Sequence, residues 1–121
     1  MTNANKEYDL EDRTLEFALS VRQMMKTLNR SITNQEDGKQ LVRSSGSVGA
    51  NYIEANEAIS KKDFKFRIKL CRKEAKESRY WLRLLLDGNQ EKSETITPLT
   101  KEAEELTKIF GSIHRKTLTN D

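Results

Sequence analysis

The chain has 121 residues, enough for one domain with one hydrophobic core, and its five Gly and one Pro are too few for the turns of a β-sandwich or barrel. Hydrophobic residues make up 35% of the chain beside 34% charged residues, which leaves a modest core and disfavours a disordered protein. One Cys and one His exclude a disulfide framework and a Cys-rich or His-rich metal centre, and a net charge of +3 is too small to indicate a nucleic-acid partner by itself.

The N-terminal segment gives no sign of export. Residues 1–12 are polar and acidic and lack the apolar stretch of a secretion signal. No run of about 18 consecutive apolar residues occurs, so a membrane-spanning helix is not expected either. We therefore expect a cytoplasmic protein without a membrane partner.

Two stripes of residues in alternating steps of three and four predict the first two helices. The stripe of the first helix, over residues 8–29, consists of Leu10, Thr14, Phe17, Val21, Met24 and Leu28. Thr33 followed by Glu36 is a capping-box pattern, so a second helix is expected over residues 34–59. The stripe of this second helix consists of Leu41, Ser45, Val48, Tyr52, Ala55 and Ile59.

A third helix is expected over residues 61–87, with Ser60 and Asp63 as a cap at its start. Gly88 follows it, and glycine commonly ends a helix in the left-handed conformation. The core face of this helix is expected to carry Phe64, Ile68, Cys71, Ala75, Ser78, Leu82 and Leu86. Cys71 then acts as a small hydrophobic side chain rather than as a reactive thiol.

The fourth helix is expected over residues 98–118, after a polar loop at 88–94. Thr97 and Pro98 fit its N-cap and first helical residue. Its stripe consists of Ile96, Leu99, Ala103, Leu106, Phe110 and Ile113. Four amphipathic helices with short connections predict an all-α, antiparallel up-and-down four-helix bundle that forms a single domain over residues 1–121.

The third helix has a second apolar face nearly opposite its core face. Its residues are Phe66, Leu70, Trp81 and Leu84. Large apolar side chains on a solvent face need a cover, and a second copy of the chain is the simplest one, so these residues are expected to form a homo-oligomer interface. The alternative is a central helix that its own neighbours bury on both sides.

A basic strip follows the same helix between the two apolar faces. Its members, at successive spacings of four and three residues, are Lys65, Lys69, Arg72, Lys76, Arg79 and Arg83. Residues 61–87 carry ten basic and four acidic side chains, a net charge of +6 that leaves −3 for the rest of the chain. Such a strip, about 40 Å long, could follow a phosphate backbone. The alternative is a solvated face that Glu11, Asp12 and Glu16 partly neutralise.

The second helix contains a run of small residues from Ser44 to Ala50, in which Gly46 and Gly49 weaken a helix. Close approach of another helix would explain the glycines, and a kink or a broken helix is the competing explanation. Ser44, Ser47, Asn51 and Glu54 form an adjoining polar edge, where Asn51 and Glu54 can meet on one face and form a structural network.

Features that indicate catalysis or cofactor binding are few. No His, second carboxylate or nucleophile stands at a helical spacing that matches Asn51 and Glu54, so no catalytic residue is assigned. His114 lacks the Glu three residues earlier that a di-iron bundle needs, because residue 111 is Gly. The phosphate-binding glycine motifs are absent as well. We expect no metal, no cofactor and no enzymatic activity.

Residues 8–116 resemble a family of small bacterial four-helix-bundle proteins, first noticed as products of intervening sequences in large-subunit ribosomal RNA genes. The most specific residues of the resemblance are Ser45, Ser47, Asn51, Ile53, Glu54, Phe64, Glu77 and Ser78. The resemblance implies an antiparallel bundle that assembles as a ring-shaped homopentamer. A related branch, the accessory proteins of diversity-generating retroelements, implies by analogy a basic surface that binds nucleic acid and a reverse transcriptase.

These observations lead to one main hypothesis and one rival. The main hypothesis is a non-enzymatic homo-oligomeric bundle that binds RNA or DNA, with little sequence specificity, through the basic strip. The rival is a protein-interaction scaffold or accessory subunit in which the strip is solvated or contacts an acidic partner protein.

Overall fold

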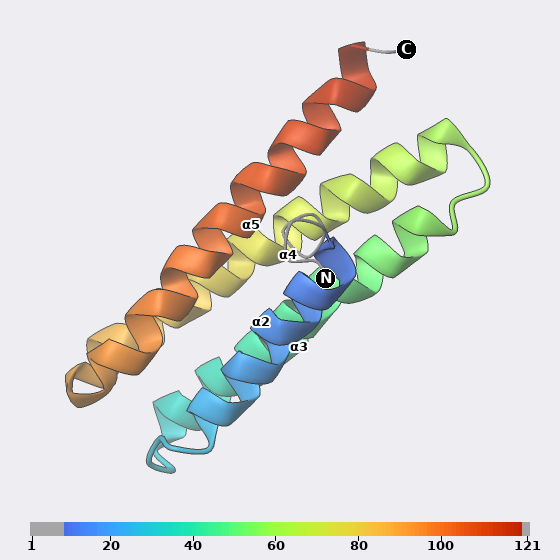
Figure 1. The fold of residues 1–121 in the computed structure, drawn as a ribbon. Helices are drawn as coiled ribbons and strands as arrows, with labels where there is room; N and C mark the ends of the chain where they lie inside the picture. The colour runs from blue at the N-terminus through green and yellow to red at the C-terminus, as the bar shows by residue number, and fades with distance from the viewer. Residues whose placement is uncertain (1–8, 120–121) are drawn as a thin grey trace, which may run out of the picture.

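Four helices form an all-α, antiparallel up-and-down bundle in a computed structural model that describes residues 9–119 (Figure 1). The helices are α2 (Leu10–Met25), α3 (Ile32–Asn56), α4 (Lys61–Gly88) and α5 (Ser93–Thr119), with a short 3₁₀ turn, η1 (Gln90–Lys92), before α5. No residue of the described range 9–119 lies in a β-strand. The fold class expected from the sequence is therefore confirmed.

The helices pack in chain order, with α3 between α2 and α4, and α5 against α4. The shortest helix is α2, with 16 residues against 25 in α3, and its contact with α5 is small. Arg13 of α2 links α2 to α5 through a bidentate ion pair with Glu102, at 2.8 Å (Nε–Oε2) and 2.9 Å (Nη2–Oε1). This pairing is the main reason that the pKa of Arg13 is raised.

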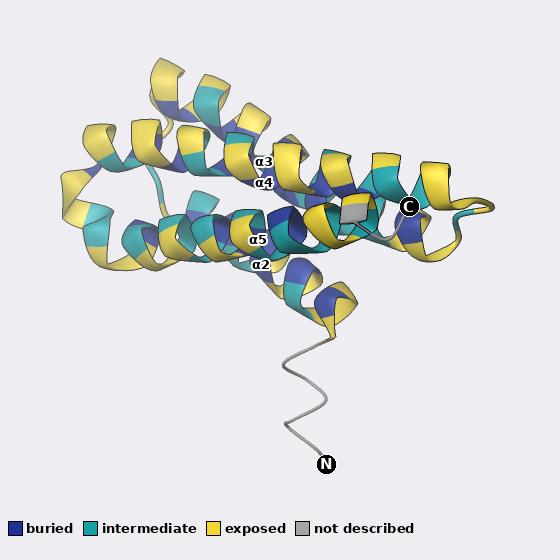
Figure 2. Ribbon diagram, turned by 90° about the horizontal axis from the view of Figure 1, so that it is seen from above, coloured by how far each residue is buried: buried dark blue, intermediate teal, exposed yellow. Residues whose placement is uncertain are grey.

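Most residues of the core belong to the predicted stripes, and they face the centre of the bundle (Figure 2). Its largest fully buried apolar side chains are Phe110, Met24, Leu41, Ile68, Leu82, Leu85, Ile96, Leu106, Val21 and Val48. In α4, Leu85 rather than Leu86 is buried, and Phe64 and Leu86 are only half-buried. None of the helices within residues 9–119 combines the length and the apolar character that a membrane crossing requires.

The ends of the first two helices differ from the prediction. The first helix ends at Met25 instead of residue 29, and its predicted first residue, 8, lies outside the described residues. α3 begins at Ile32, because Ser31 is its N-cap and its hydroxyl accepts a hydrogen bond from the Asn34 N–H at 3.1 Å. The predicted Thr33–Glu36 capping box is therefore wrong by two residues.

The turn between α3 and α4 comes earlier than expected. α3 ends at Asn56, so Ile59 lies beyond it and is exposed instead of buried. The predicted cap of the next helix is confirmed, because the Ser60 hydroxyl accepts a hydrogen bond from the Asp63 N–H at 3.0 Å.

The polar loop predicted at residues 88–94 is largely absent. Gly88 is the last residue of α4 and does not adopt a left-handed conformation. The chain turns instead at Asn89, whose side chain is buried and donates a hydrogen bond to the Leu85 carbonyl at 2.8 Å. A short 3₁₀ turn then leads directly into the last helix.

The start of α5 is also corrected, because the helix begins at Ser93 and Pro98 lies inside it. Proline has no N–H to donate and crowds the preceding turn, which costs a helix interior about 3 kcal/mol. The earlier start makes Ile96 helical and places it in the core, where it is fully buried. Burial of an isoleucine side chain stabilises a fold by roughly 1.5–3 kcal/mol and offsets much of that cost.

The glycines of α3 mark close contact with α2, as one of the two explanations predicts. A β-carbon at Gly49 would lie 2.8 Å from Oγ1 of Thr14, a separation that only glycine avoids. The helix runs without interruption from Ile32 to Asn56, so it is not broken at these glycines.

Candidate nucleic-acid interface

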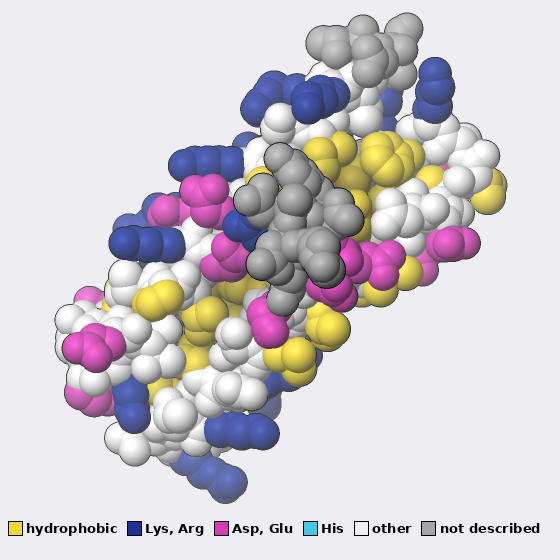
Figure 3. Space-filling model, viewed as in Figure 1, with side chains coloured by type: hydrophobic (Ala, Val, Ile, Leu, Met, Phe, Trp, Pro, Cys, Tyr) yellow, Lys and Arg dark blue, Asp and Glu magenta, His cyan; other side chains and the backbone are white. Residues whose placement is uncertain are grey.

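The basic strip of α4 lies beside α5 on the outside of the bundle. Its exposed members are Lys69, Arg72, Lys76 and Arg83, whereas Lys65 and Arg79 are partly buried. In Figure 3, Lys and Arg side chains gather along the edge of the molecule followed by α5, with acidic groups among them. The four exposed cations form no ion pair with any residue in the range 9–119.

Arg79 of the strip has a close acidic partner. Its Nε lies 2.7 Å from Oε2 of Glu104 on α5, and both side chains are partly exposed. The pair connects two neighbouring helices, so Arg79 has a structural contact that competes with any external phosphate. The sequence prediction treated all six cations alike and missed this contact.

The side chain of Arg72 on α4 contacts α5 at Gly111, which is buried. A β-carbon at Gly111 would be 3.2 Å from Nε of Arg72 and 3.6 Å from Nη1 of Arg115. Arg115 was not part of the predicted strip, yet α5 brings its guanidinium to the same place. The basic surface therefore extends from α4 onto α5.

The alternative interpretation assigns partial neutralisation of the strip to acidic residues of the first helix, yet α2 does not pack beside α4. Within residues 9–119, α2 packs against α3 and, over a small area, against α5. Glu11 instead accepts a hydrogen bond from Asn56 at 3.4 Å. One carboxylate that does contact the strip, that of Glu104, comes from α5.

The second apolar face of α4 is only partly covered by the chain itself. Phe66 is 55% and Leu84 40% exposed, while Leu70 and Trp81 are half-buried. Trp81 packs against the core at one edge. Two large apolar side chains therefore remain in contact with solvent within a single chain.

Tyr80 lies between this apolar face and the basic strip, and the sequence prediction did not include it. It is 57% exposed, and its ring contacts Trp81 edge to face with a centroid distance of 5.1 Å. Lys76 and Arg83 lie one helical turn before and after it and are exposed as well. The sequence contained a signal for this residue, because Tyr80 follows Lys76 by four residues and precedes Arg83 by three, which places an aromatic ring between two cations on one side of the helix.

A second exposed apolar patch lies on the other side of the bundle and was also missed. Leu15 and Leu19 of α2 and Ile53 of α3 are exposed there. They line a groove of about 400 Å³ whose floor includes Gly46 and Gly49. The sequence signal for this patch was that Leu15 and Leu19 lie outside the core stripe predicted for the first helix.

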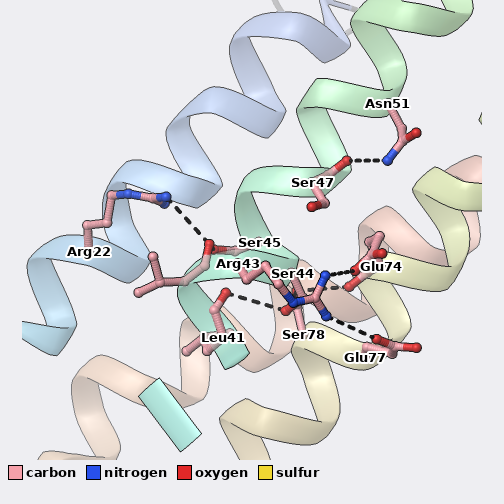
Figure 4. Close-up of polar contacts among 11 residues, drawn as sticks. Arg22, Leu41, Arg43, Ser44, Ser45, Ser47, Asn51, Glu74, Glu77 and Ser78 are labelled. Carbon is pink, nitrogen blue, oxygen red and sulfur yellow. Dashed lines mark hydrogen bonds and ion pairs between the residues drawn. The ribbon is translucent and has the colours of Figure 1, made fainter. Parts of the chain in front are cut away.

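The polar network on α3 centres on Ser44, the first residue of the predicted polar edge (Figure 4). Its buried centre is a hydrogen bond of 2.8 Å between the hydroxyls of Ser44 and Ser78, and Ser78 also donates to the Glu74 carbonyl at 2.9 Å. Arg43 lies 3.8 Å from Oε1 of Glu74 and 3.8 Å from Oε1 of Glu77. These groups join α3 to α4.

The predicted residues Ser47, Asn51 and Glu54 do not form a common cluster. The Asn51 amide donates to the backbone carbonyl of Ser47 at 2.9 Å and accepts from Arg67 at 3.3 Å, whereas the Glu54 side chain is exposed. Asn51 therefore has a structural role between α3 and α4.

Cys71 is fully buried in the core, as expected of a small hydrophobic side chain. Burial raises the pKa of its thiol to about 12. The thiolate form that reacts with electrophiles and metals is therefore disfavoured at neutral pH.

Comparisons with known proteins confirm the family resemblance. The family model for 23S rRNA-intervening sequence protein matches residues 6–112. A protein with unknown function from Bacteroides thetaiotaomicron, described as a member of the S23 ribosomal protein family, has a similar crystal structure. Its sequence is 34% identical to this chain, and the two structures superpose with a TM-score of 0.74. The match covers 86% of this chain and 96% of the other. No curated protein matches the chain. The chain belongs to the 23S rRNA-intervening sequence protein family.

Proposed function

We propose that this protein is a non-enzymatic homo-oligomeric bundle that binds RNA or DNA, with little sequence specificity, through the basic strip of α4. The observation that carries the proposal is the row of exposed cations Lys69, Arg72, Lys76 and Arg83, which form no ion pair with residues 9–119. Each contact between such a cation and a phosphate releases condensed counterions, and this release provides most of the affinity in non-specific binding.

The side chain of Tyr80 favours single strands over duplexes as the ligand. Unpaired bases stack on exposed aromatic rings, whereas the bases of a duplex are already stacked on each other. Tyr80 projects beside the strip between Lys76 and Arg83, so a base could stack on its ring while the adjacent phosphates meet the two cations.

Self-association is supported by two separate apolar surfaces. Phe66 and Leu84 are exposed on α4, and Leu15 and Leu19 are exposed on α2. Two different patches on one protomer suit a head-to-tail contact, in which the first patch of one copy covers the second patch of the next. Contacts of this kind give a ring where the rotation between copies closes, as in the homopentamer implied by the resemblance, and a ring would repeat the strip around its circumference.

The direct experiment compares two triple variants with the same change in charge. Lys69, Arg72 and Lys76 are replaced by Gln in one variant; the control replaces the exposed Lys26, Arg30 and Lys39, located around the α2–α3 connection. Affinities for several unrelated single-stranded RNA and DNA sequences are measured by fluorescence anisotropy at low salt.

We expect the α4 variant to lose about a hundredfold in affinity for all sequences alike, because phosphate contacts contain no base information. The control triple variant should lose less than about threefold, the result of the lower net charge alone. Equal losses in both variants would show that the strip is not the binding surface.

A protein-interaction scaffold is the second candidate, and the pairing of Arg79 with Glu104 is the observation in its favour. That contact shows that the strip can bind carboxylates. An acidic partner protein, or a reverse transcriptase as the retroelement analogy implies, would then occupy the strip. The scaffold function becomes the better-supported one if the unmodified protein shows no salt-sensitive binding to single-stranded or duplex nucleic acid.

A further inference from the structure

Two arginines from different helices meet above one buried glycine. Gly111 of α5 faces α4, and a β-carbon built there would lie 3.2 Å from Nε of Arg72 and 3.6 Å from Nη1 of Arg115. Both guanidinium groups therefore lie within 4 Å of one point above the glycine. The missing side chain of Gly111 leaves the space that lets them approach.

Two neighbouring positive charges repel each other, and an anion placed between them offsets that repulsion. Neither Arg72 nor Arg115 forms an ion pair with a carboxylate of residues 9–119. The nearby acidic groups of α4 face the other way, because Glu74 and Glu77 contact Arg43 of α3. The two arginines therefore form a local excess of positive charge that no described side chain balances.

We propose that Arg72 and Arg115 form a clamp for one phosphate group of a nucleic-acid backbone, above Gly111. The inference rests on the proposed function and names the site at which the strip holds a phosphate most tightly. A guanidinium offers parallel N–H donors whose geometry matches phosphate oxygens, so two of them can bind one phosphate from two sides. Lys69 and Lys76 lie one turn to either side on α4, where adjacent phosphates of the same strand would pass.

The first test removes one arginine of the clamp. Arg115 is replaced by Gln and, as a control with the same loss of charge, Arg30 is replaced by Gln in the α2–α3 connection. Both residues are exposed, so neither change removes a core contact. Affinity for a single-stranded RNA of unrelated sequence is measured by anisotropy at low salt. We expect a loss of about tenfold for Arg115→Gln and less than about twofold for Arg30→Gln.

A second test leaves the net charge unchanged. Gly111→Ala adds a methyl group 3.2 Å from Nε of Arg72, so the end of that side chain must shift by a few tenths of an ångström away from the shared position. Gly88→Ala is its control, because nothing lies within 4 Å of a β-carbon at that position. We expect affinity to fall about threefold or more with Gly111→Ala and to stay unchanged with Gly88→Ala, since separated guanidinium groups no longer share one phosphate.

The outcomes separate the clamp from the proposed function. If the unmodified protein binds RNA and both Arg115→Gln and Gly111→Ala match their controls, the clamp is wrong and the proposed function stands. If the unmodified protein binds no nucleic acid, both are wrong. Arg115→Lys provides a last check, because it keeps the charge without the paired donors and should restore less than half of the lost affinity on a logarithmic scale.

Discussion

Asn34 and Asn89 are 55 residues apart in the sequence and exchange two side-chain hydrogen bonds at one end of the bundle. Each amide nitrogen donates to the oxygen of the other, at 3.0 Å and 2.9 Å, and both side chains are buried. Asn34 also donates to the Asn29 carbonyl at 3.0 Å. The pair thus fixes the α2–α3 connection against the turn that leads into α5.

Replacement of Asn89 by Ala should lower the free energy of unfolding by about 2–3 kcal/mol. The change leaves the buried oxygen of Asn34 and the Leu85 carbonyl without their donors. Urea unfolding followed by circular dichroism measures the loss. Asn56→Ala is the control, since Asn56 is exposed and makes one side-chain contact at 3.4 Å, and its effect should stay within about 0.5 kcal/mol. Equal stability of both variants would contradict a structural role for the buried pair.

The two glycines at positions 49 and 88 should respond to alanine in opposite directions. Gly49→Ala should destabilise the fold by about 1–3 kcal/mol, because its β-carbon would lie 2.8 Å from Oγ1 of Thr14 and separate α2 from α3. Gly88→Ala should stabilise it by roughly 0.4–1 kcal/mol, because the position is helical and open. Thermal unfolding of the two variants decides the point, and a change of the same sign in both would contradict the helix contact.

The buried thiol of Cys71 should make stability fall at alkaline pH. Its pKa is raised from 9.0 to about 12 in the folded state. Above pH 9 the unfolded chain loses a proton that the folded chain keeps, so rising pH favours unfolding. The contribution of the protonated Cys71 thiol to the free energy of unfolding is therefore complete below pH 9 and is lost as the pH rises toward 12.

Urea unfolding of the natural chain and of Cys71→Ala, between pH 8 and about pH 10.5, measures this effect without the contribution of other titrating groups. Above pH 9, the natural chain should lose up to about 1.4 kcal/mol per pH unit more than the variant. Parallel pH curves for the two proteins would show that the thiol is not held in its protonated form.

The apolar face of α4 should be required for self-association. Light scattering of the natural chain at micromolar concentration should show an oligomer, and Leu70→Glu with Leu84→Glu should dissociate it while helicity largely persists. The control replaces the exposed Ile32 and Leu118 by Glu, which should leave the assembly intact. A monomeric natural chain would refute self-association as the cover of this face.

The sequence was sufficient to predict the helices because burial repeats with the helical period. Val21, Leu41, Ile68 and Leu106 all lie on predicted stripes and are fully buried. The start of α5 was missed because Pro98 satisfies the local preference for a first helical residue. The burial of Ile96 in the core, which is a tertiary interaction, instead favours a helix that begins at Ser93.

The site was predicted in part, because a helical wheel describes one helix at a time. The strip of α4 followed from spacing within that helix. Its contacts with α5 depend on how the two helices align, which brings Glu104 to Arg79 and Gly111 to Arg72. No local pattern in the sequence contains that alignment, so Arg115 was left out.

The salt dependence of nucleic-acid binding tests the central claim most directly. Affinity of the unmodified protein for a single-stranded RNA is measured by anisotropy over a range of salt concentrations. If each phosphate neutralised on a single strand contributes about −0.7 to the slope of log K against log salt, four or five strip cations predict a slope of about −3. A slope near zero, or no binding at low ionic strength, would contradict the assignment of the α4 strip as a nucleic-acid surface.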